Sequence, residues 1–364
     1  MPKVSLVKCQ DYDQNRLYSA LKQSIDLIGG IEKFVKPGYK VLIKPNLLRP
    51  AEPDEAVTTH PEFVRAVVRL VKEKSNQIFV GDSPAGLVKV DAVYDKCGIT
   101  QVAREENVNL VKFDRITKIN GIPFARIIKE VDLCISLPKF KTHNLTIITS
   151  AVKNVFGFIT GLYKVQCHKN APNHRVFSKF LAKVYSIAKP QLNIIDAIDA
   201  MDGDGPSGGT RYHLGLIVAS EDAVAADAVL SKIIGIKPDT VMTTKQAHQL
   251  GLGQADLDKI DVVGEDINRI GVDNFKLPRI AWIFRMPNII ARVLLKLMPL
   301  IMGIDRHKCS QCLACKQICP EQAIKKVNNN LKIDFQRCIL CFCCGEICPQ
   351  NAIYIRFLNR RIRG

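Results

Sequence analysis

Aromatic residues are scarce in this chain of 364 residues, where they account for 7% of the composition and include a single tryptophan. Proteins that hold single-stranded nucleic acid use aromatic side chains as stacking platforms, so this composition argues against nucleic-acid binding. The chain also lacks a run of 18 or more uncharged apolar residues, and we therefore expect no membrane-spanning helix. No apolar leader segment follows the N-terminus. No Gly-x-Gly-x-x-Gly fingerprint of dinucleotide binding follows the first predicted strand.

Positive charge is abundant but unevenly distributed. The formal net charge is +17, and the part of the chain from Asp305 onward holds 11 Lys and Arg against 4 Asp and Glu. The segment 276–304 adds 5 Lys and Arg and no acidic residue. This surplus predicts an anionic partner near the C-terminal end, such as an acidic redox protein. The candidate docking charges of the tail are Arg356, Arg360, Arg361 and Arg363.

Cysteine usage points to metal ligation. Nine of the 13 cysteines lie between Cys309 and Cys348, and the other four are scattered through the chain. A dense cluster beside lone thiols is typical of a metal centre in a reducing compartment rather than of a disulfide framework. We therefore expect a cytoplasmic protein.

Residues 1–275 alternate between apolar, β-branched runs and amphipathic stretches. Pro61–Glu73 has helical spacing of its apolar residues, and Asp222 followed by an apolar run to Ile234 and then Gly235 is typical of a capped helix. This alternation predicts a layered α/β domain with a largely parallel sheet. The predicted strands are Val4–Val7, Lys40–Ile43, Gln77–Val80, Asn109–Phe113, Asp132–Leu137, Leu192–Ile195, His213–Ala219 and Ile260–Val263.

The segment 276–304 is a basic, amphipathic linker in this interpretation. On a helix its polar residues share one narrow stripe and leave a wide apolar face. Two interpretations stay open: a linker helix packed between domains, or an interfacial helix that contacts anionic lipid or a partner subunit. The stripe consists of Arg285, Asn288, Arg292 and Lys296.

The C-terminal residues 305–364 contain an internal repeat. The segments 309–324 and 338–353 align without gaps at an offset of 29, and each has the spacing C-x2-C-x2-C-x3-C-P. This is the ligand pattern of bacterial two-cluster ferredoxins, in which three thiolates hold one 4Fe–4S cluster and the fourth holds the other. The predicted ligands are Cys309, Cys312, Cys315 and Cys348 for one cluster, and Cys338, Cys341, Cys344 and Cys319 for the second.

Zinc is the alternative metal for such a set of thiolates. Zinc sites, however, use two separated C-x2-C pairs rather than two runs of three cysteines plus one. Cys343 lies outside the pattern, since the spacing to Cys348 selects Cys344 as the ligand. We therefore interpret Cys343 as an additional buried thiol.

Polar motifs follow successive predicted strands of the first domain, where α/β proteins place their sites. They are Lys44-Pro45-Asn46, Gly81-Asp82-Ser83-Pro84, Pro138–His143, Ala151–Gly157 and the glycine-rich loop 202–209. If these motifs converge, their lysines form a cationic pocket for a carboxylate or phosphate. The candidate catalytic residues are Lys139, Lys141, His143 and Lys153. The candidate substrate-binding residues are Lys44, Asn46, Asp82, Ser83, Asn154, Asp196 and Asp204.

The aspartates of these motifs suggest a second chemistry. Asp82, Asp196, Asp202 and Asp204 are oxygen donors of the type that a hard metal ion or a proton transfer requires.

Together these motifs resemble a known family. KPN, GDS, PKxKTH, AxKNxFG and the GDGPSGG loop are similar to those of the domain of unknown function 362, over roughly residues 5–265. Members of that family are often joined to a two-cluster ferredoxin module, which residues 305–355 resemble. The resemblance implies an α/β domain at 1–275, the linker, a small α+β ferredoxin-like domain at 305–364, and two 4Fe–4S clusters.

The sequence thus predicts an iron–sulfur oxidoreductase that delivers single electrons to an anionic substrate or cofactor in the first domain. A tethered electron donor is held at high effective concentration beside its acceptor, which favours this hypothesis. The alternative is a non-catalytic electron carrier or adaptor subunit that docks on a redox partner or a membrane surface. A third hypothesis is an assembly factor that handles another metal centre.

Overall fold

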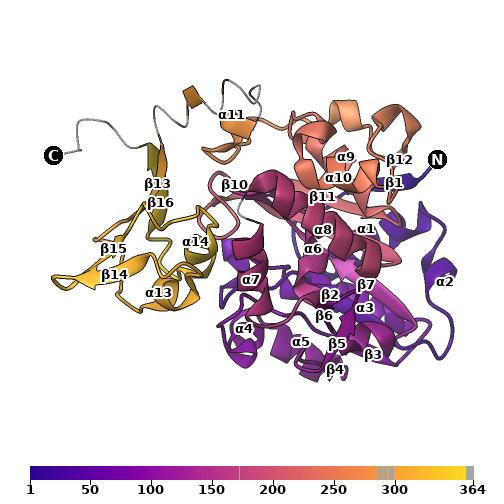
Figure 1. The fold of residues 1–364 in the computed structure, drawn as a ribbon. Coiled ribbons are helices and arrows are strands. Elements are labelled where there is room, and N and C mark those ends of the chain that lie inside the picture. The colour runs from indigo at the N-terminus through magenta and orange to yellow at the C-terminus, as the bar shows by residue number, and fades with distance from the viewer. Residues whose placement is uncertain (172, 285, 287–289, 291–292, 295–298, 358–364) are drawn as a thin grey trace.

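The computed structural model describes residues 1–171, 173–284, 286, 290, 293–294 and 299–357. Within them the N-terminal part forms an α/β fold around a ten-stranded sheet in the order β12-β1-β11-β10-β7-β2-β3-β4, with β8 paired to β10 and β9 paired to β8 (Figure 1). The strands are β1 Lys3–Lys8, β2 Val41–Pro45, β3 Ile78–Val80, β4 Asn109–Leu110, β7 Leu133–Leu137, β8 Lys139–His143, β9 Ile147–Thr149, β10 Leu192–Asp202, β11 Thr210–Ser220 and β12 Asp261–Gly264.

The sheet is largely parallel, as the sequence predicts. β2 pairs in parallel with both β3 and β7, and β10 pairs in parallel with β7 and β8, whereas β11 runs antiparallel to β1 and β10. Successive side chains of a strand point to opposite faces, and Val41 and Ile43 join one apolar core while Leu42 joins the other. Both faces are therefore buried, which explains the continuous apolar runs of these strands.

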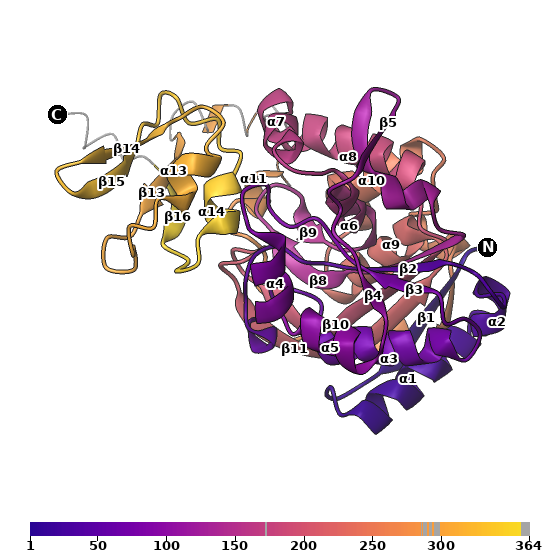
Figure 2. The ribbon, with the colours of Figure 1, turned by 90° about the horizontal axis from the view of Figure 1, so that it is seen from below.

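Helices cover both faces of the sheet (Figure 2). One core packs under α1, α3, α4 and α5, and the other under α6, α8, α9 and α10. The helices are α1 Gln14–Asp26, α2 Ile31–Phe34, α3 Pro61–Lys72, α4 Val90–Lys96, α5 Ile99–Glu105, α6 Ala151–Asn154, α7 Tyr163–Asn170, α8 His174–Ala188, α9 Ala223–Ile233 and α10 Met242–Gln249. Short 3₁₀ helices lie at Pro53–Glu55, Arg126–Lys129, Val155–Phe158, Pro238–Thr240, Leu257–Lys259 and Ile267–Arg269.

The predicted helix caps are confirmed. The Asp222 side chain accepts hydrogen bonds from the backbone N–H of Val224 (2.9 Å) and Ala225 (3.0 Å), and so caps α9. Gly235 follows the helix with a φ of 76°, a left-handed conformation that glycine adopts without strain.

The structure extends the predicted strands at two places. Within the motif Pro138–His143, Lys139–His143 forms a further strand, β8. The strand predicted at Leu192–Ile195 is longer, since β10 continues to Asp202 past a register shift between Ala197 and Asp199. A separate hairpin of β5 Ile116–Ile119 and β6 Ile122–Ala125 was also not predicted.

The C-terminal part forms a small α+β unit. β13 Leu300–Ile304 pairs antiparallel with β16 Ile353–Phe357, and β14 Ile324–Val327 pairs with β15 Asn330–Ile333. Two short helices, α13 Ala314–Ile318 and α14 Cys343–Ile347, occupy equivalent places in the two repeats. In both views α14 is the one that lies nearer the N-terminal part (Figures 1 and 2).

The linker is described only in part, with α11 at Ala281–Phe284. The polar stripe of Arg285, Asn288, Arg292 and Lys296 lies outside the described residues, as do the tail arginines 360, 361 and 363. Among the described residues, every helix is too short or too polar to span a bilayer.

Candidate functional site

The eight motif cysteines line two separate cavities in the C-terminal unit. One cavity is bordered by Cys309, Cys312, Cys315 and Cys348. A second cavity is bordered by Cys319, Cys338, Cys341 and Cys344. Each cavity therefore combines three cysteines of one repeat with the fourth cysteine of the other, which is the interleaved grouping expected from the spacing.

The backbone around these cysteines suits an iron–sulfur cluster. The amide of Ala323 donates to Cys319 Sγ at 3.2 Å, and that of Ala352 donates to Cys348 Sγ at 3.3 Å. Such hydrogen bonds stabilise anionic sulfur and tune the reduction potential of a cluster. An all-sulfur donor set in two groups of four and amide donors beside the sulfurs together fit 4Fe–4S ligation.

Cys343 does not border either cavity, whereas its neighbour Cys344 does. Its thiol is buried, with Sγ 3.9 Å from the carbonyl oxygen of Cys341. This position agrees with the interpretation of Cys343 as an additional buried thiol.

The C-terminal unit docks on the N-terminal part through α14. His143 Nε2 of β8 lies 3.1 Å from Glu346 Oε1, and Ser207 Oγ donates to the carbonyl oxygen of Gly345 at 3.0 Å. Val88 and Val165 of the N-terminal part pack against an apolar cluster of the C-terminal unit, which consists of Ile318, Cys341, Cys343 and Ile347. The glycine-rich loop 202–209 and the PKxKTH motif thus form part of a domain interface.

His143 has a defined protonation state at this interface. Its Nδ1 accepts the N–H of Leu145 at 3.0 Å, so its proton is on Nε2, which faces Glu346. Burial lowers the pKa of His143 to about 3, and the charge of Lys153 adds to the shift. Burial alone would raise the pKa of Glu346, but the hydrogen bond from His143 and the charge of Lys153 keep it below its usual range. At neutral pH the pair is therefore a neutral imidazole facing a carboxylate.

Three lysines near this interface have no carboxylate bonded to them among the described residues. Burial lowers the pKa of Lys153, Lys141 and Lys164, the last to about 7. Lys141 donates to the carbonyl oxygen of Val57. Their charges are poorly compensated, a condition that an anionic ligand would relieve.

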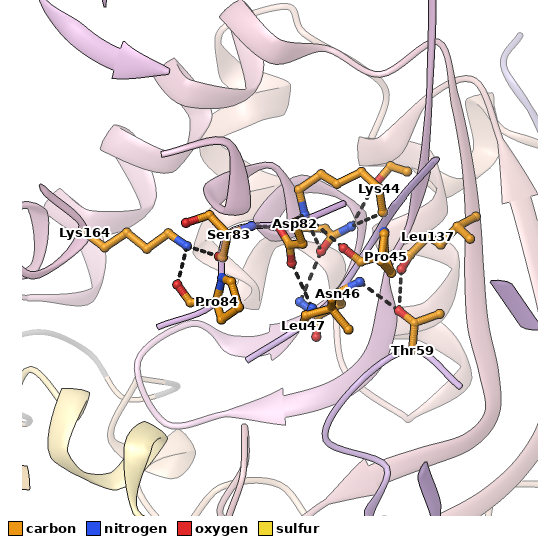
Figure 3. A network of polar contacts seen from close by, with 12 residues as sticks. Lys44, Pro45, Asn46, Leu47, Thr59, Asp82, Ser83, Pro84, Leu137 and Lys164 are labelled. Carbon is orange, nitrogen blue, oxygen red and sulfur yellow. Dashed lines mark hydrogen bonds and ion pairs between the residues drawn. The ribbon is translucent and has the colours of Figure 1, made fainter. Parts of the chain in front are cut away.

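Lys164 was not predicted from the sequence. It donates to the carbonyl oxygen of Ser83 and to that of Pro84, the latter at 2.9 Å (Figure 3). It lies in α7, outside every motif, so only the folded chain brings it to the loop that carries Ser83.

Lys44 is held in a buried network (Figure 3). Its Nζ lies 2.8 Å from Asp82 Oδ1 and 3.3 Å from Asn154 Oδ1, which also accepts the Nδ2 of Asn46 at 3.1 Å. Gly157 covers this network so closely that a Cβ there would lie 2.0 Å from Asp82 Oδ1. The charge of Lys44 is thus compensated within the protein.

Lys139 is held in a second network. Its Nζ lies 2.9 Å from Asp196 Oδ2 and donates to the Tyr12 hydroxyl at 2.9 Å, while Tyr12 donates to Asp196 Oδ1 at 2.8 Å. Tyr12 was not predicted, because it lies in a loop without a motif. The structure thus divides the predicted cationic pocket: Lys44 and Lys139 are paired with aspartates, whereas Lys153 and His143 face the C-terminal unit.

The four aspartates considered for a hard metal ion or a proton transfer do not gather into one metal site among the described residues. Asp82 and Asp196 are paired with lysines, Asp204 pairs with Arg279 at 3.0 Å, and Asp202 accepts the N–H of Lys276 at 3.0 Å. In the described ranges, no three His, Cys, Asp or Glu side chains surround a point where a single metal ion would fit. Each carboxylate instead supports the local fold.

Comparisons with known proteins agree with this architecture. Residues 301–349 match the 4Fe–4S dicluster domain, which gives the C-terminal unit an iron–sulfur, electron-transfer role. A thylakoid-associated protein of Synechocystis sp. is 34% identical over 284 residues, which cover 76% of this chain and 88% of that protein.

Two solved structures share limited similarity. The lactate racemase apoprotein of Thermoanaerobacterium thermosaccharolyticum has a TM-score of 0.39 at 11% identity, over 61% of this chain and 54% of that one. A Thermotoga maritima protein has a TM-score of 0.36 at 13% identity, over 67% of this chain and 60% of that one. Residues 41–232, more than half of the chain, match the domain of unknown function DUF362. The protein therefore belongs to the DUF362 family, with an iron–sulfur domain joined to its C-terminal side.

Proposed function

We propose that the protein is an iron–sulfur oxidoreductase that delivers single electrons to an anionic substrate or cofactor held beside Lys153 and His143. Two 4Fe–4S clusters, held by the two interleaved cysteine quartets, would supply one-electron transfer. The observation that carries the proposal is the docking of α14, which bears Cys344, against His143 of β8. The second quartet thereby adjoins the lysines of the first domain.

The chain's own residues support an anionic acceptor. Burial lowers the pKa of both Lys153 and Lys141, and the charge of Lys153 lowers the pKa of Lys141 further. A positive charge in such surroundings attracts an anion more strongly than it would in water. His143 offers its Nε2–H and Glu346 a carboxylate, so the interface also contains groups that orient a polar ligand.

The test begins with metal content. Protein purified without oxygen should be brown and hold about eight iron atoms per chain, four for each cluster. Colourless, zinc-loaded protein would contradict the proposal. The reduced protein is then mixed with small carboxylates and phosphates, and cluster re-oxidation is followed by absorbance.

Lys153→Met should slow re-oxidation by the responsive anion about tenfold or more, because a charge-assisted contact contributes about 1.5–3 kcal/mol. Lys179→Met is the matched control, since Lys179 is exposed on α8 and is not one of the buried lysines at the domain interface. Both variants should keep the wild-type iron content. Equal rates for the two variants would show that the ligand lies elsewhere, and no re-oxidation by any small anion would favour the adaptor alternative.

A peripheral membrane contact is a second candidate role, favoured by the thylakoid association of the Synechocystis relative. We propose that the basic segment 276–304 makes this contact with anionic lipid. Wild-type protein should sediment with anionic vesicles but not with neutral ones. Replacing Arg285, Arg292 and Lys296 together by Ser should abolish the difference, and unchanged sedimentation would contradict this role. The cytoplasmic location stays a prediction.

A further inference from the structure

The two cysteine loops have nearly the same backbone. Leu313 and Phe342, 29 positions apart, have φ and ψ of 64° and 2° and of 64° and 0°. The residues that follow the two short helices, Cys319 and Cys348, share a φ of −69° and a ψ of 113°. Any difference in exposure between the two loops therefore comes from what packs on them.

The surroundings of the two loops differ at one edge. Cys315 and its equivalent Cys344 are both buried. Cys341 of the second loop is buried in the apolar cluster that contacts the N-terminal part, whereas its equivalent Cys312 is exposed, together with the neighbouring Ser310 and Gln311. The second quartet thus lies on the side of the N-terminal part, and the first quartet reaches the solvent at Cys312.

The sequences of the loops match these surroundings. Ser310 and Gln311 of the first loop correspond to Ile339 and Leu340 of the second. Lys316 corresponds to Gly345, whose carbonyl oxygen accepts the Ser207 hydroxyl across the interface. At these three positions the covered loop therefore carries apolar or small residues and the open loop polar or charged ones, as expected for a buried and a solvated face.

The open loop also carries positive charge. Arg306, Lys308 and Lys316 are exposed, and none of the three forms an ion pair with another described residue. The acidic neighbour, Asp305, uses its carboxylate to accept the N–H of His307 at 2.9 Å. Lys308 borders a cavity at the domain interface together with Gly345 and Glu346, so we name Arg306, Lys316 and the exposed edge at Cys312 the donor face.

We propose that the donor face docks an acidic one-electron carrier protein, so that electrons enter at the first quartet and leave through the second. The exit of electrons through the second quartet rests on the proposed function, whereas the docking of the donor protein does not. Opposite charge speeds the encounter and orients the two proteins. If the donor is an anionic flavin hydroquinone, it loses one electron and becomes the neutral semiquinone, while the first quartet's site gains that electron. No proton needs to cross the contact.

The test measures binding of an acidic flavodoxin to the full, iron-loaded protein by calorimetry. Affinity for the wild type should fall as salt increases. The double variant Arg306→Glu, Lys316→Glu should bind about tenfold more weakly or worse, because two attractive charges become repulsive. The control, Lys326→Glu with Arg337→Glu, makes the same change in net charge at exposed positions outside the donor face and should bind as the wild type does.

Iron content and circular dichroism establish that both double variants are folded. If the two double variants bind flavodoxin with equal affinity, whether that affinity is unchanged from the wild type or equally reduced, the donor face is wrong. A donor-face variant that fails to bind flavodoxin but is still re-oxidised by the anion after dithionite reduction would support both proposals. Selective loss of binding in a protein that no anion re-oxidises would support the donor face and reject the proposed function.

Discussion

At the scale of single residues, several motif positions are partners of one another inside the fold. Lys44 of KPN, Asp82 of GDS and Asn154 of AxKNxFG meet in one buried network. Removing one member of such a pair leaves an unpaired buried charge, which costs about 3–5 kcal/mol. The three motifs therefore meet for a structural reason, and under the proposed function the ligand-binding positions would be a smaller set around Lys153.

Gly157 offers a direct test of this view. In Gly157→Ala the added methyl group would lie 2.0 Å from Asp82 Oδ1 and 2.5 Å from Lys44 Nζ, so the ion pair must shift. We expect a loss of about 1–3 kcal/mol in the free energy of unfolding, measured by urea denaturation with circular dichroism. Gly271→Ala is the control, because nothing lies within 4 Å of a Cβ there. An equal effect in both variants would contradict a close-packed network at Gly157.

At the scale of elements, α13 and α14 show how a small change in sequence decides which helix docks. Both helices start after a residue in the left-handed conformation, and a motif cysteine directly follows each of them. Only α14 presents a glycine and a glutamate, Gly345 and Glu346, to the N-terminal part. The equivalent residues of α13 are Lys316 and Gln317, whose charge and length would oppose the same contact.

We therefore expect Gly345→Lys, which copies α13 into α14, to detach the C-terminal unit while it stays folded. A Cβ at this position meets only Ile353, at 3.9 Å, so the helix itself tolerates the change. Small-angle scattering should report a larger radius of gyration, and iron content should not change. Lys316→Gly is the reciprocal control and should keep the wild-type radius. A compact Gly345→Lys variant would show that α14 does not govern the docking.

At the scale of the whole molecule, the sequence predicted the main strands of a largely parallel sheet, but not β8, the hairpin of β5 and β6 or the partners of the lysines. Apolar runs such as Val41–Pro45 are buried on both faces, and this leaves a pattern that can be recognised without a structure. The interleaved cysteines are also local, since their spacing alone predicts which of them share a cavity.

Long-range pairing leaves no such local pattern. Tyr12 and Asp196 meet Lys139 although 184 positions separate them, and no spacing rule connects them. The same holds for His143 and Glu346, which belong to different parts of the chain. A lysine after a strand looks the same in sequence whether it meets an aspartate, a carbonyl oxygen or a ligand, so the predicted pocket grouped residues that the fold separates.

The internal repeat has a consequence for how this molecule arose. Duplication of one cysteine loop yields two equivalent cysteine sites. The loops differ at their surface, where Ser310 corresponds to Ile339 and Lys316 to Gly345, while the backbone conformation and the cysteine spacing are the same in both. A few substitutions at the surface of the two loops therefore suffice to place one of them at the domain interface and to leave the other at the solvent.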